Sequence, residues 1–138
     1  MAGKHGWNDL EDYLRVLLRV LDDHPFEIQH TLKIRPSPEG GLIEGQVYCH
    51  GDVVIDVHKR YDVRQRSSEQ QARTVRYSYN VRYENGKKVL RYDNSHNRRG
   101  DLTPHHKHDF RRRKVMHVGP DWPHLSDVLD EVMAIVWR

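Results

Sequence analysis

The spacing of apolar residues changes at Pro25, and this change constrains the fold more than any other feature of the sequence. Before it, leucines recur at helical spacing over residues 8–24, and Asn8 and Glu11 have the spacing of a capping box. Pro25 ends this helix because it lacks a backbone donor. After it, apolar and polar residues alternate from Phe26 to Ile34, as in a half-buried strand. The sequence therefore predicts a helix that leads into a sheet.

Further strands are predicted downstream. Alternation over Leu42 to His50 and Val53 to Val63 indicates two of them. The stretch from Arg64 to Arg73 lacks periodicity and large apolar side chains, so we expect a solvated loop there. Asn85-Gly86 is the preferred pair of a two-residue type I′ turn and predicts a hairpin. After Pro123, apolar residues return to helical spacing and predict a C-terminal helix.

These elements predict an α+β fold. A five-stranded, mainly antiparallel sheet, built from a meander plus a hairpin, would have the N-terminal and the C-terminal helix packed on one face. A length of 138 residues suits one domain over residues 1–138. Residues 1–25 are interpreted as an added N-terminal helix, whose leucine stripe also fits a homodimer or antitoxin-docking contact, although most such stripes are core.

Composition narrows the class of protein. Cys49 is the single cysteine, so neither an internal disulfide nor a thiolate zinc cage can form, which favours a reducing cytoplasm. No apolar run approaches the roughly 18 residues of a membrane span, so no membrane partner is expected. The formal charge of +3 and clustered Arg and Lys favour a polyanionic partner.

The expected hairpin has an arginine-bearing face. A two-residue turn would place Arg82 opposite Val89 and Asn80 opposite Arg91, with Arg76 on the same face. Guanidinium groups bind phosphate through paired hydrogen bonds and stack on bases. A solvated outer face with cross-strand Arg–Asp pairs explains the same pattern. The tyrosines of the other face are predicted to be core.

A histidine-rich stretch follows the hairpin, with His96, His105, His106 and His108 near Asp93 and Asp101. An extended backbone would point the rings of His106 and His108 to one side, and imidazole both transfers protons and ligates metals. No zinc signature is present and Lys107 disfavours a cation, so no metal and no cofactor are predicted. A merely solvated loop is the other reading. Asp93 is predicted to orient a neighbouring Arg or His.

A compact basic run extends this stretch. Arg111, Arg112, Arg113 and Lys114 form a patch able to displace counterions from a nucleic-acid backbone. Basic runs of this length are also common on ordinary protein surfaces.

Two motifs carry a resemblance to a known family. V-L-R-Y-D-N-S-H, Val89 to His96, and T-P-H-H-K-H, Thr103 to His108, resemble the TumE-type toxin family of prokaryotic toxin–antitoxin systems. The similarity spans roughly Ile28 to the C-terminal helix; the N-terminal helix and the long stretch from Arg64 to Arg73 depart from the family pattern. The resemblance implies a small toxin neutralised by an antitoxin with a helix-turn-helix domain.

The combined hypothesis is a toxin that acts on RNA as a metal-independent endoribonuclease. His106 and His108 would transfer protons and Asp93 would orient the site. The nucleic-acid-binding residues would be Arg76, Arg82, Arg91, Lys107, Arg111, Arg112 and Arg113. A non-catalytic nucleic-acid- or partner-binding module, and a metal-dependent nuclease that uses the histidines, remain the alternatives.

Overall fold

The computed structural model describes residues 6–94, 105–118 and 123–137. Its two helices are α1 (Leu10–Asp23) and α2 (Leu125–Val136). Its strands are β1 (Asn8–Asp9), β2 (Glu27–His30), β3 (Lys33–Ser37), β4 (Gly40–Cys49), β5 (Val53–Arg66), β6 (Glu69–Tyr83), β7 (Lys88–Asp93), β8 (His106–Asp109) and β9 (Lys114–His117).

The strands form one nine-stranded antiparallel sheet in the part of the chain that the structure describes. Seven of them follow the order β2-β4-β5-β6-β7-β8-β9, while β1 pairs with β6 and β3 pairs with β4. The prediction of a five-stranded sheet is therefore wrong. The structure adds β1, β8 and β9 and divides one expected strand into β2 and β3.

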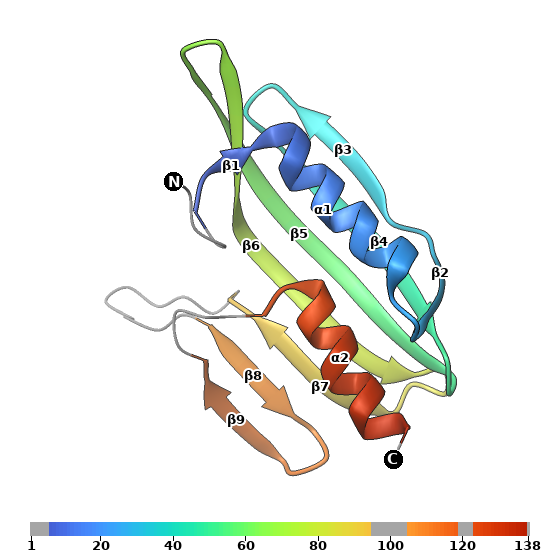
Figure 1. The fold of residues 1–138 in the computed structure, drawn as a ribbon. Coiled ribbons are helices and arrows are strands. Elements are labelled where there is room, and N and C mark those ends of the chain that lie inside the picture. Colours follow the sequence, from blue (N-terminus) through green and yellow to red (C-terminus); the bar gives the residue numbers. More distant parts are fainter. Residues whose placement is uncertain (1–5, 95–104, 119–122, 138) are drawn as a thin grey trace.

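Both helices lie over the same face of the sheet (Figure 1). Leu17 and Leu21 of α1 and Leu129 and Val132 of α2 are buried against inward-facing strand residues. These inward residues include Ile43, Val47, Ile55, Val57, Tyr77, Tyr79, Val81 and Leu90. The opposite face of the sheet has no helix over it in Figure 1, and we call it the outer face.

Helix α1 begins one residue later than the predicted capping box. Asp9 is its N-cap, and the Asp9 carboxylate accepts a hydrogen bond from the backbone N–H of Asp12 at 3.0 Å. The Asn8 side chain instead donates to the carbonyl of Gly6. The helix ends at Asp23, two residues before Pro25, as the missing proline donor requires.

The division between β2 and β3 lies opposite Gly45 of β4. Gly45 has a φ of +147°, and a Cβ there would lie 2.6 Å from the carbonyl oxygen of Thr31. The Thr31 hydroxyl accepts from the N–H of Gln46, which replaces a regular ladder bond. The edge of the sheet therefore bends at this position, which the alternation of Phe26 to Ile34 did not indicate.

Residues 64–73, predicted to be a loop, instead belong mainly to the long β5–β6 hairpin. Arg64 lies opposite Gln71 and Arg66 opposite Glu69, and the turn places Ser67 at a φ of +56°. The end of this hairpin projects beyond both helices (Figure 1). No helix covers this end of the hairpin. Backbone pairing holds the two strands, and the Trp7 ring stacks on Arg64 and Arg73.

The Asn85-Gly86 hairpin between β6 and β7 has a longer turn than predicted. Ser78 pairs with Asp93 and Val81 with Leu90, as the sequence predicted, but a bulge then places Arg82 opposite Lys88 rather than Val89. A type I′ turn needs a positive φ at both central residues, and here Gly86 has one while Asn85 does not. The bonds from Gly86 N–H to Tyr83 and from Tyr83 N–H to Lys87 match a three-residue loop with a glycine bulge.

Candidate functional site

The candidate site is built on the outer face of β7 and β8. Strand β8 pairs with β7 so that Arg91 lies opposite His108 and Asp93 lies opposite His106. Because side chains alternate across a strand, these four side chains share one face. Their inward neighbours Leu90 and Tyr92 are buried in the helix-covered core. The histidines predicted to share one side therefore lie beside the hairpin arginine.

Asp93 is the centre of this cluster. Its side chain is 0% exposed, and its Oδ2 atom lies 2.7 Å from Arg91 Nε and 3.8 Å from His108 Nε2. A buried carboxylate is costly unless it is paired, and the Arg91 guanidinium supplies the opposite charge at Oδ2. In turn, Asp93 holds the Arg91 guanidinium and lies close to the His108 ring. The orienting role of Asp93 stays a prediction, and the structure places its carboxylate beside Arg91 and His108.

The other members of the cluster reach solvent. The side chain of Arg91 is 38% exposed and that of His108 is 27% exposed. Arg91 uses Nε for Asp93, and a guanidinium has further N–H donors with which to bind an oxyanion. The cluster thus combines two imidazoles, a fixed carboxylate and an accessible guanidinium, which are the groups that metal-free proton transfer on a phosphodiester requires.

His105 lies outside this cluster. Its Nδ1 atom is 3.0 Å from the hydroxyl of Tyr77, and the two rings stack with centroids 5.7 Å apart. Burial, with a smaller contribution from His106, lowers the pKa of His105. Burial also disfavours the charged form of Tyr77 and so raises its pKa. His105 therefore helps to anchor β8 to the core, while His96 and Asp101 lie outside the described residues.

Lys107 points to the helix-covered side of β8. Its Nζ atom lies 2.9 Å from Oε1 of Glu131 on α2, and the Tyr92 hydroxyl donates to the same carboxylate at 3.0 Å. Lys107 is thus engaged in holding α2 against the sheet and lies away from the outer-face cluster. Sequence reasoning did not identify Glu131, because it lies 24 residues away on a helix whose register to β8 cannot be read from spacing.

Arg82 is held in an outer-face network one strand away. Its Nε atom lies 2.8 Å from Oδ2 of Asp56, and Gln46 donates to the other oxygen of that carboxylate at 2.9 Å. Burial alone would raise the pKa of Asp56, but the Arg82 hydrogen bond and charge hold it below its usual value. This is the cross-strand Arg–Asp pair of a solvated face. Arg76 is exposed and lies opposite Arg60 of β5.

The basic run forms the turn between β8 and β9. Arg111 binds both carboxylate oxygens of buried Asp109, at 3.2 and 3.1 Å. Burial would raise the pKa of Asp109, and hydrogen bonds from Arg111 outweigh it and lower that pKa. Arg112 Nε lies 3.8 Å from the same carboxylate, whereas exposed Arg113 takes a φ of +54°. Much of the predicted basic patch is therefore neutralised locally.

Metal binding is another use of the histidines that the sequence left open. Among residues 6–94, 105–118 and 123–137, no three His, Cys, Asp or Glu side chains are grouped so that they would hold a metal ion. The approach of Arg91 to Asp93 also sets a positive charge where a cation would have to bind.

Comparison with protein families identifies the chain. The family model described as Toxin TumE matches residues 17–136, a range that includes the whole cluster. The chain belongs to the TumE toxin family. A toxin of this family implies an antitoxin partner, and the resemblance carried by the R-Y-D-N and H-K-H motifs is confirmed. No curated protein and no solved structure matches the chain significantly.

Two further predictions concern the toxin as a whole. The family match begins inside α1, so the interpretation of residues 1–25 as an addition stays a prediction. No helix in the described part of the toxin is long and apolar enough to cross a membrane.

Proposed function

We propose that this TumE-family toxin acts on RNA as a metal-independent endoribonuclease, with its reaction centre on the outer face of β7 and β8. The observation that carries the proposal is the arrangement around Asp93. One buried carboxylate binds Arg91 at 2.7 Å and faces His108 at 3.8 Å, while His106 lies opposite it in the strand register. In this proposal Asp93 orients the His108 imidazole and the Arg91 guanidinium toward the same phosphate.

The proposed step is an internal transesterification. His108, oriented by Asp93, takes the proton from the ribose 2′-hydroxyl as that oxygen attacks phosphorus. The bond from phosphorus to the 5′-oxygen of the next nucleotide breaks, and protonated His106 gives that oxygen its proton. Arg91 stabilises the additional negative charge on the phosphate oxygens. The products are a 2′,3′-cyclic phosphate and a 5′-hydroxyl, so atoms and charges balance without a metal.

RNA contacts outside the reacting phosphate would come from exposed cations. Arg76 on β6 and Arg113 in the β8–β9 turn are exposed and suit backbone phosphates. Arg82, Arg111 and Arg112 would add a smaller contribution, because each already shares a carboxylate. Lys107 is left out of the proposed RNA surface, since it binds Glu131 on the opposite side of the strand.

The experiment is cleavage of a labelled RNA by purified toxin in EDTA. We expect cutting by the wild type and a loss of at least about a hundredfold in the His106→Ala, His108→Ala double variant, since general acid–base catalysis contributes about 10²–10⁴-fold. His58→Ala is the matched control, because His58 is an exposed outer-face histidine on β5. Equal cutting by the double variant would remove both histidines from the mechanism. RNA that binds without being cut would favour the non-catalytic binding module.

The antitoxin and the compartment are proposed from the resemblance. We infer an antitoxin with a helix-turn-helix domain and a cytoplasmic site of action, where RNA is available. Co-expression of the adjacent reading frame with the toxin, followed by co-purification and sequencing of the bound protein, tests the identity of the partner.

A further inference from the structure

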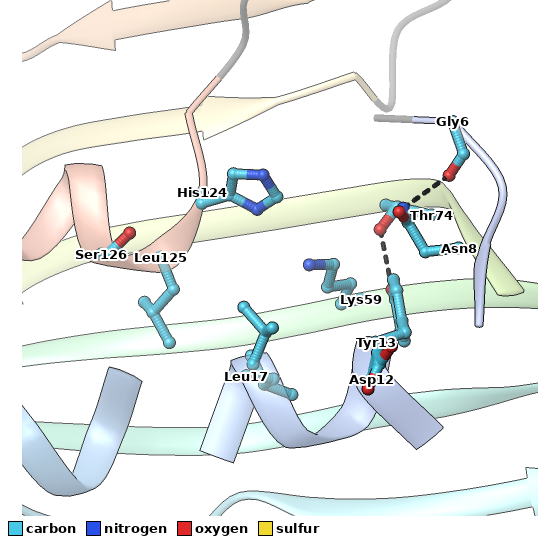
Figure 2. A pocket seen from close by; sticks show the side chains of 11 residues that line it. Gly6, Asn8, Asp12, Tyr13, Leu17, Lys59, Thr74, His124, Leu125 and Ser126 are labelled. Carbon is cyan, nitrogen blue, oxygen red and sulfur yellow. Dashed lines mark hydrogen bonds between the residues drawn. The ribbon is translucent and has the colours of Figure 1, made fainter. Parts of the chain in front are cut away.

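A cavity of about 270 Å³ lies on the helix-covered side of the sheet, away from the outer-face cluster. It opens between the beginnings of α1 and α2, above β5 and β6 (Figure 2). Tyr13 and Leu17 of α1 line one side, and His124 and Leu125 line another. The floor is formed by Lys59 of β5 and Thr74 of β6.

Lys59 is the unusual member of this lining. It is 4% exposed, and Figure 2 shows its amine directed into the cavity. Within the described part of the chain, no carboxylate forms an ion pair with Lys59 and no group accepts a hydrogen bond from it. The Lys59 amine lies over the Tyr13 ring, whose centroid is 5.3 Å from Nζ. An ammonium group with so little solvent and no counter-ion lacks the pairing that buried charges generally have.

The Tyr13 and Thr74 hydroxyl groups in the cavity and the two carboxylates near it have other partners. The Tyr13 hydroxyl is 2.7 Å from the Thr74 hydroxyl, so these two groups satisfy each other. Asp12 lies at the exposed rim, where its carboxylate accepts from Arg15 at 3.3 Å. Asp127 accepts from the His124 N–H at 2.9 Å and caps α2. Neither of these two carboxylates forms an ion pair with Lys59.

Helix α2 adds positive potential to the same space. Its first residues, Leu125 and Ser126, line the cavity, and the N-terminal end of a helix carries a partial positive charge. Asp127 offsets part of this charge within the first turn. The lysine and the helix end therefore favour an anionic group near Nζ, while Val16, Leu17 and Leu125 offer an apolar wall.

We propose that this cavity binds a small organic oxyanion, with its carboxylate or phosphate on Lys59 and its apolar body against Leu17 and Leu125. Ligand pockets commonly measure about 300–1,000 Å³, so a cavity of 270 Å³ suits a molecule the size of one aromatic ring with its headgroup. A nucleic-acid chain would not fit. The site is separate from the proposed RNA surface and does not depend on the proposed activity.

The test is calorimetric titration of the full-length toxin at pH 7 with benzoate, phenyl phosphate and neutral benzyl alcohol. We expect at least one of the two anions to bind at least about tenfold more tightly than the alcohol, because a hydrogen bond between charged groups is stronger than one to a neutral hydroxyl. The Lys59→Met variant should lose that preference and bind all three probes equally weakly. Lys33→Met, at an exposed strand lysine, should behave as the wild type.

A second measurement does not rely on the variant. In toxin labelled with ¹³C at lysine ε-carbons, the signal of Lys59 should move on addition of the bound anion, while the signal of Lys33 should not. Equal affinity for the anions and the alcohol, binding of neither anion, or unchanged anion affinity in Lys59→Met would each overturn the proposal.

Discussion

The Nε atom of Arg91 lies 2.7 Å from Oδ2 of Asp93, a carboxylate with no solvent exposure at the end of the same strand. Residues two apart in a strand share a face, so this pair belongs to the strand itself and does not depend on a distant loop. Pairing with β8 then brings His108 to the same oxygen, at 3.8 Å. The R-Y-D-N motif thus supplies both the anchor and the cation of the candidate site.

Replacing Asp93 by Asn should weaken both the fold and the site. The change removes the buried carboxylate charge that lies 2.7 Å from Arg91 Nε, and breaking a buried ion pair is destabilising. We expect a loss of about 2 kcal/mol in the free energy of unfolding, measured by urea denaturation, and loss of RNA cleavage. Asp52→Asn is the control, because Asp52 is exposed in a turn at a φ of +59° that Asn also adopts. Unchanged stability in Asp93→Asn would contradict this account of the buried carboxylate.

Lys107 and Arg91 should differ in their effect on RNA binding. Lys107→Met breaks the 2.9 Å contact with Glu131 between β8 and α2, so we expect a loss of about 1–2 kcal/mol in unfolding free energy and RNA affinity within a factor of about two. Arg91→Met should lower RNA affinity and reduce the salt dependence of binding by about one unit of slope. Urea denaturation measures the unfolding free energy, and fluorescence anisotropy over a salt series measures the RNA affinity and its salt dependence. The reverse pattern would place Lys107, and not Arg91, on the RNA surface.

The sequence was sufficient to predict the hairpin face but not the strands beyond it. Alternation around Tyr79 and Val81 fixes which side chains enter the core, and the register from Ser78 to Val81 follows from it. Strands β8 and β9 were missed because inward-facing Lys107 and Asp109 are charged, which hides the apolar alternation of a strand. Their charges are satisfied by Glu131 and Arg111, and the Glu131 pairing exists only after folding.

Local sequence also failed to predict the turn type and the number of available cations. Asn-Gly favours a type I′ turn, yet the pair also fits a type I turn that ends in a glycine bulge, and local sequence does not distinguish them. In the sequence, the run from Arg111 to Lys114 indicates four positive charges that are available to a partner. In the fold, Asp109 accepts from Arg111 and lies close to Arg112, so composition overstated the available cations.

Two glycines should differ in their tolerance of alanine. At Gly86 a Cβ meets no atom within 4 Å, so Gly86→Ala should cost about 1 kcal/mol, for the positive φ of +92° alone. At Gly45 a Cβ would lie 2.6 Å from the Thr31 carbonyl and 2.8 Å from the Leu32 Cα, in a backbone region that is nearly restricted to glycine. We expect Gly45→Ala to cost at least about 3 kcal/mol in urea denaturation. Equal costs would contradict the close approach of β4 to the bend after β2.

The buried lysine should make stability depend on pH. Burial lowers the pKa of Lys59 from 10.5 to about 8, so between pH 8 and 10 the unfolded chain keeps a proton that the folded chain has released. Stability relative to Lys59→Met should therefore rise with pH across this window, by up to about 3 kcal/mol over the whole shift. Paired urea denaturations at pH 7 and pH 9.5 measure the difference, and the variant cancels the contributions of the tyrosines. If the stability of the wild type relative to Lys59→Met stays constant or falls from pH 7 to pH 9.5, the burial of a charged amine at Lys59 is contradicted.

The chemistry at the ends of the RNA fragments tests the central claim most directly. RNA cut by the wild-type toxin in EDTA should carry 5′-hydroxyl ends and 2′,3′-cyclic phosphate ends, and an RNA with a 2′-deoxy sugar at the cleavage position should stay intact. Those results would follow from proton transfer by His106 and His108 without a metal. Fragments with 3′-hydroxyl and 5′-phosphate ends, or cutting that stops in EDTA and returns with a divalent metal, would contradict the account.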